Sequence, residues 1–278
     1  MNKGDFPVDW PVDEGIHRVR MRDGRSALLK RRSGMPPSFF ESESLGLGML
    51  AEARALRVPE VWSIGHDHLL LEDLGTGTPE KDYASNAGKG LARQHQVRGD
   101  TFGLGHDGWC GDSPQDNTPD TQGARFFAQR RLLPQARRAH QSGRLDASDL
   151  ARVDRLTRRL PDLIPEHPAV LLHGDLWSGN LHCCGNGEPA LIDAGAAHFG
   201  WAEADLAMLT LFGDPGADFF AAYREHTALD RDWRERAPLY NLYHLLNHLN
   251  LFGGAYLAQV QSILRRFTAV SRSSDHSA

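Results

Sequence analysis

The chain reads HGDLWSGN at residues 173–180 and LIDAG at residues 191–195. Short apolar stretches, AVLL at 169–172 and ALID at 190–193, predict two strands that flank a loop. This strand–loop–strand unit allows Asp175, Asn180 and Asp193 to converge. Two carboxylates and an amide offer the oxygen ligands that Mg²⁺ prefers, and Mg²⁺ held in this way is usually shared with phosphates.

The spacing H-x-D-x-x-x-x-N, followed by a strand that carries Asp, is the order used by protein-kinase-like folds. In phosphoryl transfer the protein aligns an acceptor hydroxyl with the terminal phosphate and offsets negative charge. The pattern therefore predicts Asp175 as the catalytic base and Asn180 and Asp193 as metal ligands. His173 is expected to pack and hold the loop more than to transfer a proton.

A partner lysine for the phosphates should stand on a strand nearer the N-terminus. IHRVRM (16–21) and SALLKRR (26–32) predict a β-hairpin around RDG, and the second strand carries Lys30. A helix is expected over 39–56, ending before Pro59, and it offers Glu41 and Glu43 as acidic partners for the lysine.

The rest of the chain indicates a second, larger lobe. HDHLLLEDL (66–74) reads as a buried strand leading into GTGTP (75–79), which we expect to be the hinge between lobes at 1–75 and 76–278. Helices are expected over 124–143 and 146–164, and a C-terminal helix is expected to start at Pro238. Residues 271–278 are expected to form a frayed tail.

Composition restricts the class of protein further. The net charge of −5, with no long Lys/Arg block, argues against a general nucleic-acid surface. No signal peptide and no run of 18 apolar residues is visible, so a cytoplasmic protein without a membrane span is expected. Cys110, Cys183 and Cys184 fit a reducing compartment. The adjacent pair and His182 could form a zinc site, but ordinary loop thiols fit better.

Several stretches together resemble the fructosamine and ketosamine kinase family, relatives of aminoglycoside phosphotransferases with a protein-kinase-like fold. The resemblance covers nearly the whole chain. It is carried by LLHGDLWSGN (171–180), EADLAMLTLFG (203–213), FFAQRRLLPQ (126–135) and LYNLYHLLNHLNLFGGAY (239–256). It implies an α+β fold of two lobes, with a small, mainly antiparallel β N-lobe containing one helix and a larger helical C-lobe.

The resemblance also implies an activity, which is ATP- and Mg²⁺-dependent phosphorylation of a sugar hydroxyl, at the third carbon of a fructosamine or ribulosamine. Asp175 corresponds to the catalytic aspartate, Asn180 and Asp193 to the magnesium ligands, and Lys30 to the phosphate lysine. Between the two candidate acidic partners, the resemblance favours Glu43.

Further residues receive roles from the same likeness. LEDL (71–74) is similar to the segment that joins the lobes, so Glu72 and Leu74 are expected to meet adenine through their backbone groups. Asp205 is expected to be a buried acceptor that steadies the catalytic loop.

Residues for the sugar amine are less sharply indicated. Trp177 could offer a flat face to the sugar ring or simply pack the loop. His244, Asn247 and His248 follow one another at helical spacing, and a polar stripe inside the lobe fits them better than acceptor binding.

The sequence departs from the family pattern at two places. The phosphate-covering turn, WPVDEGIHRVRM (10–21), holds only Gly15 together with Asp13 and Glu14, which would repel phosphate unless they face away. DAG stands where DPA is more usual, and Ala194 should leave the backbone looser.

Alternatives therefore remain: a kinase of aminoglycosides or other small hydroxylated acceptors, or a nucleotide-binding pseudokinase. Cys110 could respond to oxidants, although a simple loop cysteine fits better. The oligomeric state is not indicated.

Overall fold

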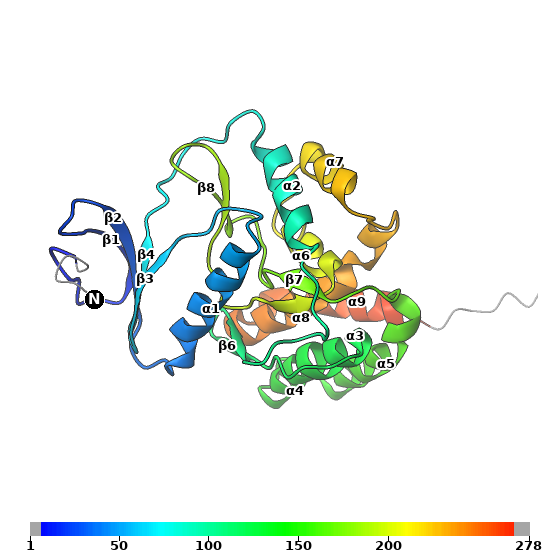
Figure 1. Cartoon of the computed structure of the whole chain (residues 1–278). Coiled ribbons are helices and arrows are strands. Elements are labelled where there is room, and N and C mark those ends of the chain that lie inside the picture. Colours follow the sequence, from blue (N-terminus) through cyan, green and yellow to red (C-terminus); the bar gives the residue numbers. More distant parts are fainter. Residues whose placement is uncertain (1–6, 270–278) are drawn as a thin grey trace, which may run out of the picture.

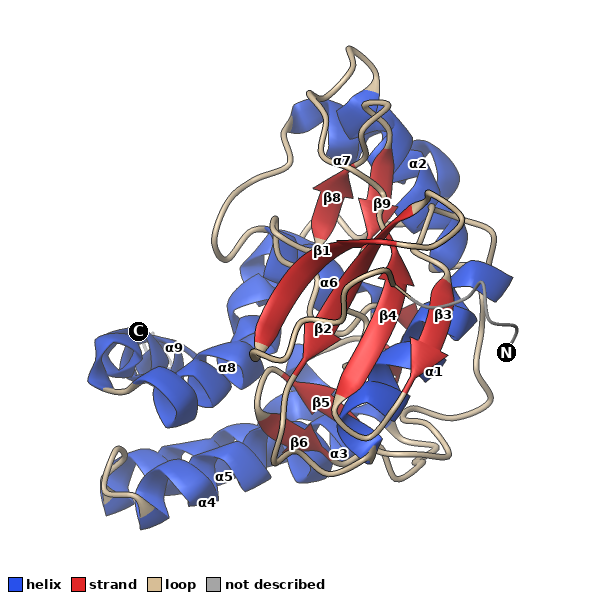
Figure 2. Ribbon diagram, turned by 90° about the vertical axis from the view of Figure 1, so that its left-hand side faces the viewer, coloured by secondary structure: helices blue, strands red, loops and turns tan. Residues whose placement is uncertain are grey.

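A computed structural model describes residues 7–269, which divide into a small β-sheet and a larger, mainly helical part (Figure 1). The strands of the sheet are antiparallel and lie in the order β1-β2-β4-β3, as Figure 2 shows face on. They are β1 Gly15–Arg20, β2 Ser26–Arg31, β3 Val61–Ile64 and β4 His68–Glu72. Helix α1, Ser38–Glu52, lies between this sheet and the helical part. The predicted α+β, two-lobed fold is confirmed.

The alternation of side chains along β2 sets the direction of its lysine. Ala27 and Leu29 are fully buried on one face, in a small core cluster with residues of β1 and β4. Successive residues of a strand point to opposite faces, so Leu28 and Lys30 share the other face. Leu28 packs there against the main hydrophobic core. The expected hairpin is present, with Lys30 opposite Ile16 on β1.

The larger part contains helices, one π-helical turn (Phe127–Leu132) and three two-stranded ladders. Its helices are α2 Tyr83–Gln94, α3 Gly123–Phe126, α4 Leu133–Gln141, α5 Ala147–Leu163, α6 Ala202–Leu209, α7 Ala217–His226, α8 Trp233–Phe252 and α9 Leu257–Thr268, with a 3₁₀ turn at Gly254–Tyr256. Its strands are β5 Gly108–Cys110, β6 Ser113–Gln115, β7 Val170–Leu172, β8 Leu181–Cys183, β9 Pro189–Leu191 and β10 His198–Gly200.

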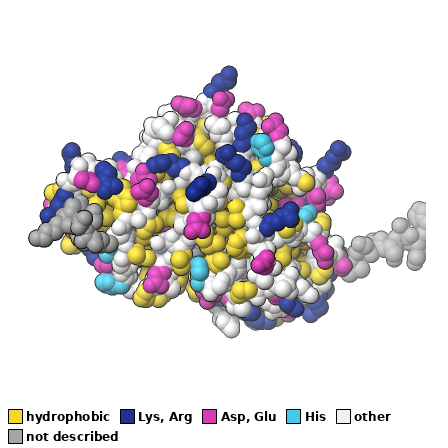
Figure 3. All heavy atoms as spheres, in the orientation of Figure 1, with side chains coloured by type: hydrophobic (Ala, Val, Ile, Leu, Met, Phe, Trp, Pro, Cys, Tyr) yellow, Lys and Arg dark blue, Asp and Glu magenta, His cyan; other side chains and the backbone are white. Residues whose placement is uncertain are grey.

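The helix expected over 146–164 is present as α5, and its apolar side chains face the core. Val153, Leu156 and Leu160 are fully buried, and α5 packs on α9 and α4. Among residues 7–269, no helix combines the length and apolar character needed to cross a membrane. On the face shown in Figure 3, Lys and Arg side chains are interspersed with Asp and Glu.

Two predicted helix boundaries were wrong. Helix α1 ends at Glu52, and Arg54 takes a left-handed conformation with φ of 50°. The chain therefore leaves the helix earlier than the position that Pro59 predicts. Helix α8 begins at Trp233, not Pro238, which lies inside the helix. Trp233 is fully buried against Phe220, with ring centroids 5.4 Å apart. This packing holds the first turn in place although the proline cannot donate a helical hydrogen bond.

The two strands around the loop at 173–180 exist, but they do not pair with each other. β7 pairs with β10, and β9 pairs with β8 to form a hairpin directly after the loop. β9 ends at Leu191, so Asp193 lies beyond the strand, with φ of 60°. The predicted tail at 271–278 lies outside the described residues.

Candidate active site

An open cleft separates the β-sheet and α1 from the loops of the helical part. Its volume is about 360 Å³. Its walls include most of the residues that the sequence predicted for phosphoryl transfer, namely Gly15, Lys30, Glu43, Asp175, Trp177, Asn180 and Asp193. Segments separated by more than 160 residues in the sequence therefore meet at one surface.

Lys30 is the centre of an ion-pair network in this cleft. Its Nζ lies 2.5 Å from Oε1 of Glu43 and also contacts Oδ1 of Asp193. Burial alone would lower the pKa of Lys30, but these two carboxylates outweigh burial and raise the pKa above its usual value. Of the two candidate partners on α1, Glu43 is buried against the lysine and Glu41 is exposed. The lysine is therefore a fixed positive charge at the cleft wall.

The loop that begins at His173 is held by a buried carboxylate. Asp205, on α6, accepts the backbone N–H of His173 at 2.8 Å and that of Gly174 at 2.9 Å. The imidazole of His173 is fully buried, and its Nε2 lies 2.7 Å from the Ile192 carbonyl oxygen. Gly174 has φ of 83°, and a Cβ there would stand 2.1 Å from the Ala196 carbonyl oxygen, so only glycine fits.

Asp175 follows directly and has an unusual environment. Its side chain keeps only 22% of its exposed surface. Burial raises its pKa to about 6, and the negative charges of Asp193 and Asp205 add to this effect. A carboxylate with a pKa close to neutrality is suited to accept a proton from a substrate hydroxyl.

The β8–β9 hairpin brings Asn180 and Asp193 together. Leu181 pairs with Leu191, and the Ile192 amide donates to the Asn180 carbonyl at 3.2 Å. The side-chain amide of Asn180 donates to the Asp175 carbonyl at 2.8 Å, which leaves its side-chain oxygen available to a cation. The two predicted metal ligands therefore lie on the paired ends of one hairpin.

The segment after Asp193 is tightly packed, so the expected looseness at Ala194 was wrong. Ala194 is fully buried, and α1 approaches it closely. A Cβ built on Gly46 would stand 2.0 Å from the Ala194 carbonyl oxygen. Helix packing thus fixes the backbone direction that proline would otherwise fix.

One acid of the phosphate-covering turn, Glu14, is bound to Ser33 and is not among the residues that line the cleft. The Glu14 carboxylate accepts the Ser33 amide at 3.1 Å and contacts the Ser33 hydroxyl. Gly15 lines the cleft, with φ of 123°. The Glu14 carboxylate is therefore already engaged by Ser33, whereas Gly15 is part of the cleft wall.

The segment that joins the two parts has fewer free backbone groups than expected. The Glu72 amide donates to the Glu60 carbonyl at 2.8 Å, and the Leu74 carbonyl accepts the Gly185 amide at 2.8 Å. The Glu72 side chain pairs with Arg57. Within the described residues, the Leu74 amide has no intramolecular acceptor and remains available to a ligand.

The predicted acceptor residues do not form one group. Trp177 stands at the cleft with 40% of its surface exposed. His244 is buried behind the loop, where its Nδ1 lies 3.6 Å from Oδ1 of Asp175. Asn247 donates to the Cys110 carbonyl at 3.1 Å, and His248, in a tilted ring contact with Phe252, is not part of the cleft lining.

Sequence reasoning missed part of the cleft wall. Trp109 lines it and donates to the Ser38 hydroxyl at 3.3 Å, and Arg32 also lines it and pairs with Asp112. Both residues lie in stretches with no motif spacing, so only the folded chain reveals them.

This combination of a β-sheet lysine, a helix glutamate and a loop with Asp, Asn and a following Asp defines the class of two-lobed small-molecule kinases. The family model for fructosamine kinase matches residues 15–270. The chain therefore belongs to the fructosamine kinase family, as the sequence resemblance predicted.

Individual relatives agree with this assignment. A protein of Synechocystis sp. named as a ketoamine kinase is 39% identical over 232 residues, covering 82% of this chain and 78% of its own length. A chloroplastic protein-ribulosamine 3-kinase of rice, Oryza sativa, is 32% identical over 254 residues, covering 87% and 72%. A crystal structure from Thermobifida fusca, named as a fructosamine-3-kinase, superposes with a TM-score of 0.85 at 35% identity, covering 91% and 88%.

Proposed function

We propose that this phosphotransferase transfers the terminal phosphate of ATP to a hydroxyl of a ketosamine, a fructosamine or a ribulosamine. The observation that carries the proposal is the single cleft in which Lys30, Asp175, Asn180 and Asp193 meet. A nucleotide-binding pseudokinase, which catalyses no transfer, would not need all four groups at one surface. The names of the relatives support the sugar amine as acceptor.

The donor set fits a magnesium ion. The free side-chain oxygen of Asn180 and the Asp193 carboxylate, whose side chain is 42% exposed, are hard oxygen ligands that face the cleft. Mg²⁺ held between them would neutralise part of the phosphate charge.

Lys30 and Glu43 are the proposed phosphate-binding pair. The ammonium would bind phosphate oxygens of ATP, and Glu43 would keep it aimed into the cleft. Lys30 contacts Asp193 as well as Glu43, so a bound phosphate would replace the Asp193 carboxylate as the partner of the lysine and leave Asp193 to the metal. The Leu74 amide is the proposed donor to the adenine ring.

Asp175 is the proposed catalytic base. It accepts the proton of the acceptor hydroxyl while the hydroxyl oxygen forms its bond to the terminal phosphorus and the bond from phosphorus to ADP breaks. Asp205 and His173 support it by fixing the loop backbone. Trp177, exposed beside Asp175, is the proposed face for the sugar ring.

We further propose that the protein works in the cytoplasm as one unit hinged near Gly75, with the lobes at 1–75 and 76–278. The three free cysteines fit a reducing compartment. Gly75 has φ of 68°, a conformation that favours glycine at a turn between the parts.

The test is ADP release from ATP and Mg²⁺ with a panel of ribulosamines, fructosamines and aminoglycosides. We expect turnover on ketosamines and a decrease of about two to four decades for Asp175→Ala, the usual scale for a lost acid–base group. Asp162→Ala, which removes an exposed carboxylate on α5, is the matched control and should keep full activity. Turnover confined to aminoglycosides, or equal background rates for wild type and Asp175→Ala, would refute the proposal.

A further inference from the structure

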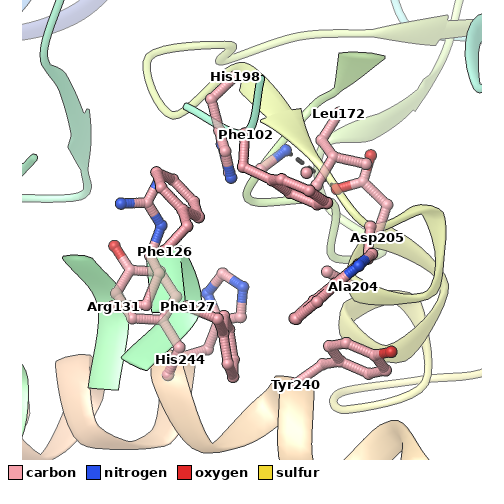
Figure 4. Close-up of a pocket in the computed structure, with 14 residues that line it drawn as sticks. Phe102, Phe126, Phe127, Arg131, Leu172, His198, Ala204, Asp205, Tyr240 and His244 are labelled. Atoms are coloured by element: carbon pink, nitrogen blue, oxygen red, sulfur yellow. Dashed lines mark hydrogen bonds between the residues drawn. The ribbon is translucent and has the colours of Figure 1, made fainter. Parts of the chain in front are cut away.

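Three side chains from distant parts of the chain meet behind the catalytic loop. Cys110 ends β5, Asp175 lies in the loop, and His244 is in the middle of α8. The Cys110 Sγ lies 3.9 Å from Nδ1 of His244, and that nitrogen lies 3.6 Å from Oδ1 of Asp175. All three atoms lie within 4.8 Å of one another. Figure 4 shows the His244 ring rising from α8 into the enclosed pocket beside Arg131 and Phe127.

The spacing of these atoms suits a tetrahedral zinc ion. Zn–S bonds of about 2.3 Å and Zn–N or Zn–O bonds of about 2.0 Å place ligand atoms about 3.3 to 3.6 Å apart. The two separations that involve Nδ1 of His244, 3.9 Å to Sγ of Cys110 and 3.6 Å to Oδ1 of Asp175, need to contract by only a few tenths of an ångström. Sulfur, imidazole nitrogen and one carboxylate form a donor set that selects Zn²⁺ over Mg²⁺, which prefers oxygen ligands.

The surroundings fix the positions of the three groups, although burial raises the pKa of the Cys110 thiol, so the metal itself must displace the thiol proton. Cys110 is 2% exposed, and the side-chain amide of Asn247 contacts both its carbonyl oxygen, at 3.1 Å, and its Sγ, at 3.4 Å. The imidazole of His244 is also buried, and its Nδ1 is the ring atom that lies nearest to both Cys110 and Asp175. Asp175 borders the open cleft, which gives an ion a path to the site.

We propose that Cys110, Asp175 and His244 form an inhibitory zinc site at the back of the active site. The inhibition rests on the proposed function, because Zn²⁺ would occupy the carboxylate that accepts the substrate proton. On binding, the S–H bond of Cys110 breaks, its proton leaves to solvent and a Zn–S bond forms. The thiolate and the carboxylate together balance the charge of the ion, and water completes the fourth position.

Binding can be measured without catalysis by adding Co²⁺ to the whole protein, since Co²⁺ takes the same ligands as Zn²⁺ and reports a bound thiolate by charge-transfer absorption. We expect one Co²⁺ per chain with this absorption, displaced by Zn²⁺. Cys110→Ala should abolish the band, whereas Cys183→Ser with Cys184→Ser should keep it. A band that survives Cys110→Ala, or that the double variant removes, overturns the site.

Inhibition is measured as ketosamine turnover at constant Mg²⁺ and ATP with buffered free Zn²⁺. Cys110 takes no part in the proposed catalysis, so Cys110→Ala should keep the basal rate. It should also raise the Zn²⁺ concentration for half-inhibition by more than about tenfold, because a lost ligand costs at least as much as a lost outer-shell partner. Equal Zn²⁺ sensitivity of wild type and Cys110→Ala overturns the inhibitory role.

The two readouts separate this inference from the proposed function. A Cys110-dependent Co²⁺ band in a protein that phosphorylates no ketosamine would support the metal site and refute the function. Ketosamine turnover by a protein that shows no Co²⁺ band would support the proposed function and refute the metal site. If Cys110→Ala melts at a much lower temperature than wild type, Cys110→Ser provides the same comparison with a smaller change in packing.

Discussion

Replacing Asp175 with asparagine should abolish activity and yet stabilise the protein. A carboxyl group whose pKa is about 6 when folded and 3.8 when unfolded makes the folded state about 3 kcal/mol less stable once it is fully ionised. Asparagine has nearly the same shape and cannot ionise. Asp175→Asn should therefore raise the free energy of unfolding at neutral pH by up to that amount.

The sign follows from proton binding. The raised pKa means that the folded protein binds a proton more tightly than the unfolded chain, so stability decreases as pH rises from about 4 through about 6. The gain from Asp175→Asn should be about 3 kcal/mol at pH 7.5 and only about 1 kcal/mol at pH 4.5, because at the lower pH the folded carboxyl group is already protonated.

The assay is urea denaturation of both proteins at the two pH values. Asp193→Asn is the matched control, because it also removes a cleft carboxylate but breaks the ion pair with Lys30 and should lower stability. If Asp175→Asn is less stable than wild type at pH 7.5, or if its effect does not change with pH, the burial argument for Asp175 fails.

Three further predictions follow from the same geometry. The kcat/KM for ketosamines should decrease by about tenfold per pH unit below pH about 6, because Asp175 must be ionised to accept a proton, and a flat profile down to pH 5 in stopped assays would contradict that role. Gly46→Ala should reduce activity sharply, since its Cβ would collide with the Ala194 carbonyl. Gly48→Ala has open space, so it should leave activity intact and raise the melting temperature slightly. Equal activities and melting temperatures of the two variants would contradict the close packing of α1 against Ala194. Lys30→Met should reduce kcat/KM for ATP by about 10²-fold, the scale of one lost charge-stabilising donor, as measured by initial rates against ATP concentration, and an unchanged value would remove the lysine from the phosphate site.

The sequence alone was sufficient to predict those parts of the site whose positions are set by local structure. Asp175, Asn180 and Asp193 lie on one loop and the hairpin after it, so a short motif predicts their meeting. Lys30 and Glu43 follow from strand alternation and an adjacent helix. In each case short connections leave few alternative arrangements.

Features set by tertiary packing were not predictable in the same way. The start of α8 at Trp233 depends on contact with Phe220, and the rigid backbone at Ala194 depends on Gly46 of α1. The approach of His244 to Asp175 joins helix α8 to a loop nearly seventy residues earlier in the chain. No local pattern in the sequence encodes these contacts. The division into lobes at residues 75 and 76 stays a prediction.

The most direct test of the central claim is phosphorus NMR of the product formed from ATP, Mg²⁺ and a ribulosamine. We predict a single new phosphate ester on the third carbon of the sugar with wild-type protein, and no such signal above background with Asp175→Ala. A phosphate ester formed equally well by Asp175→Ala, or no ester on any ketosamine from a folded wild-type protein, would contradict the account.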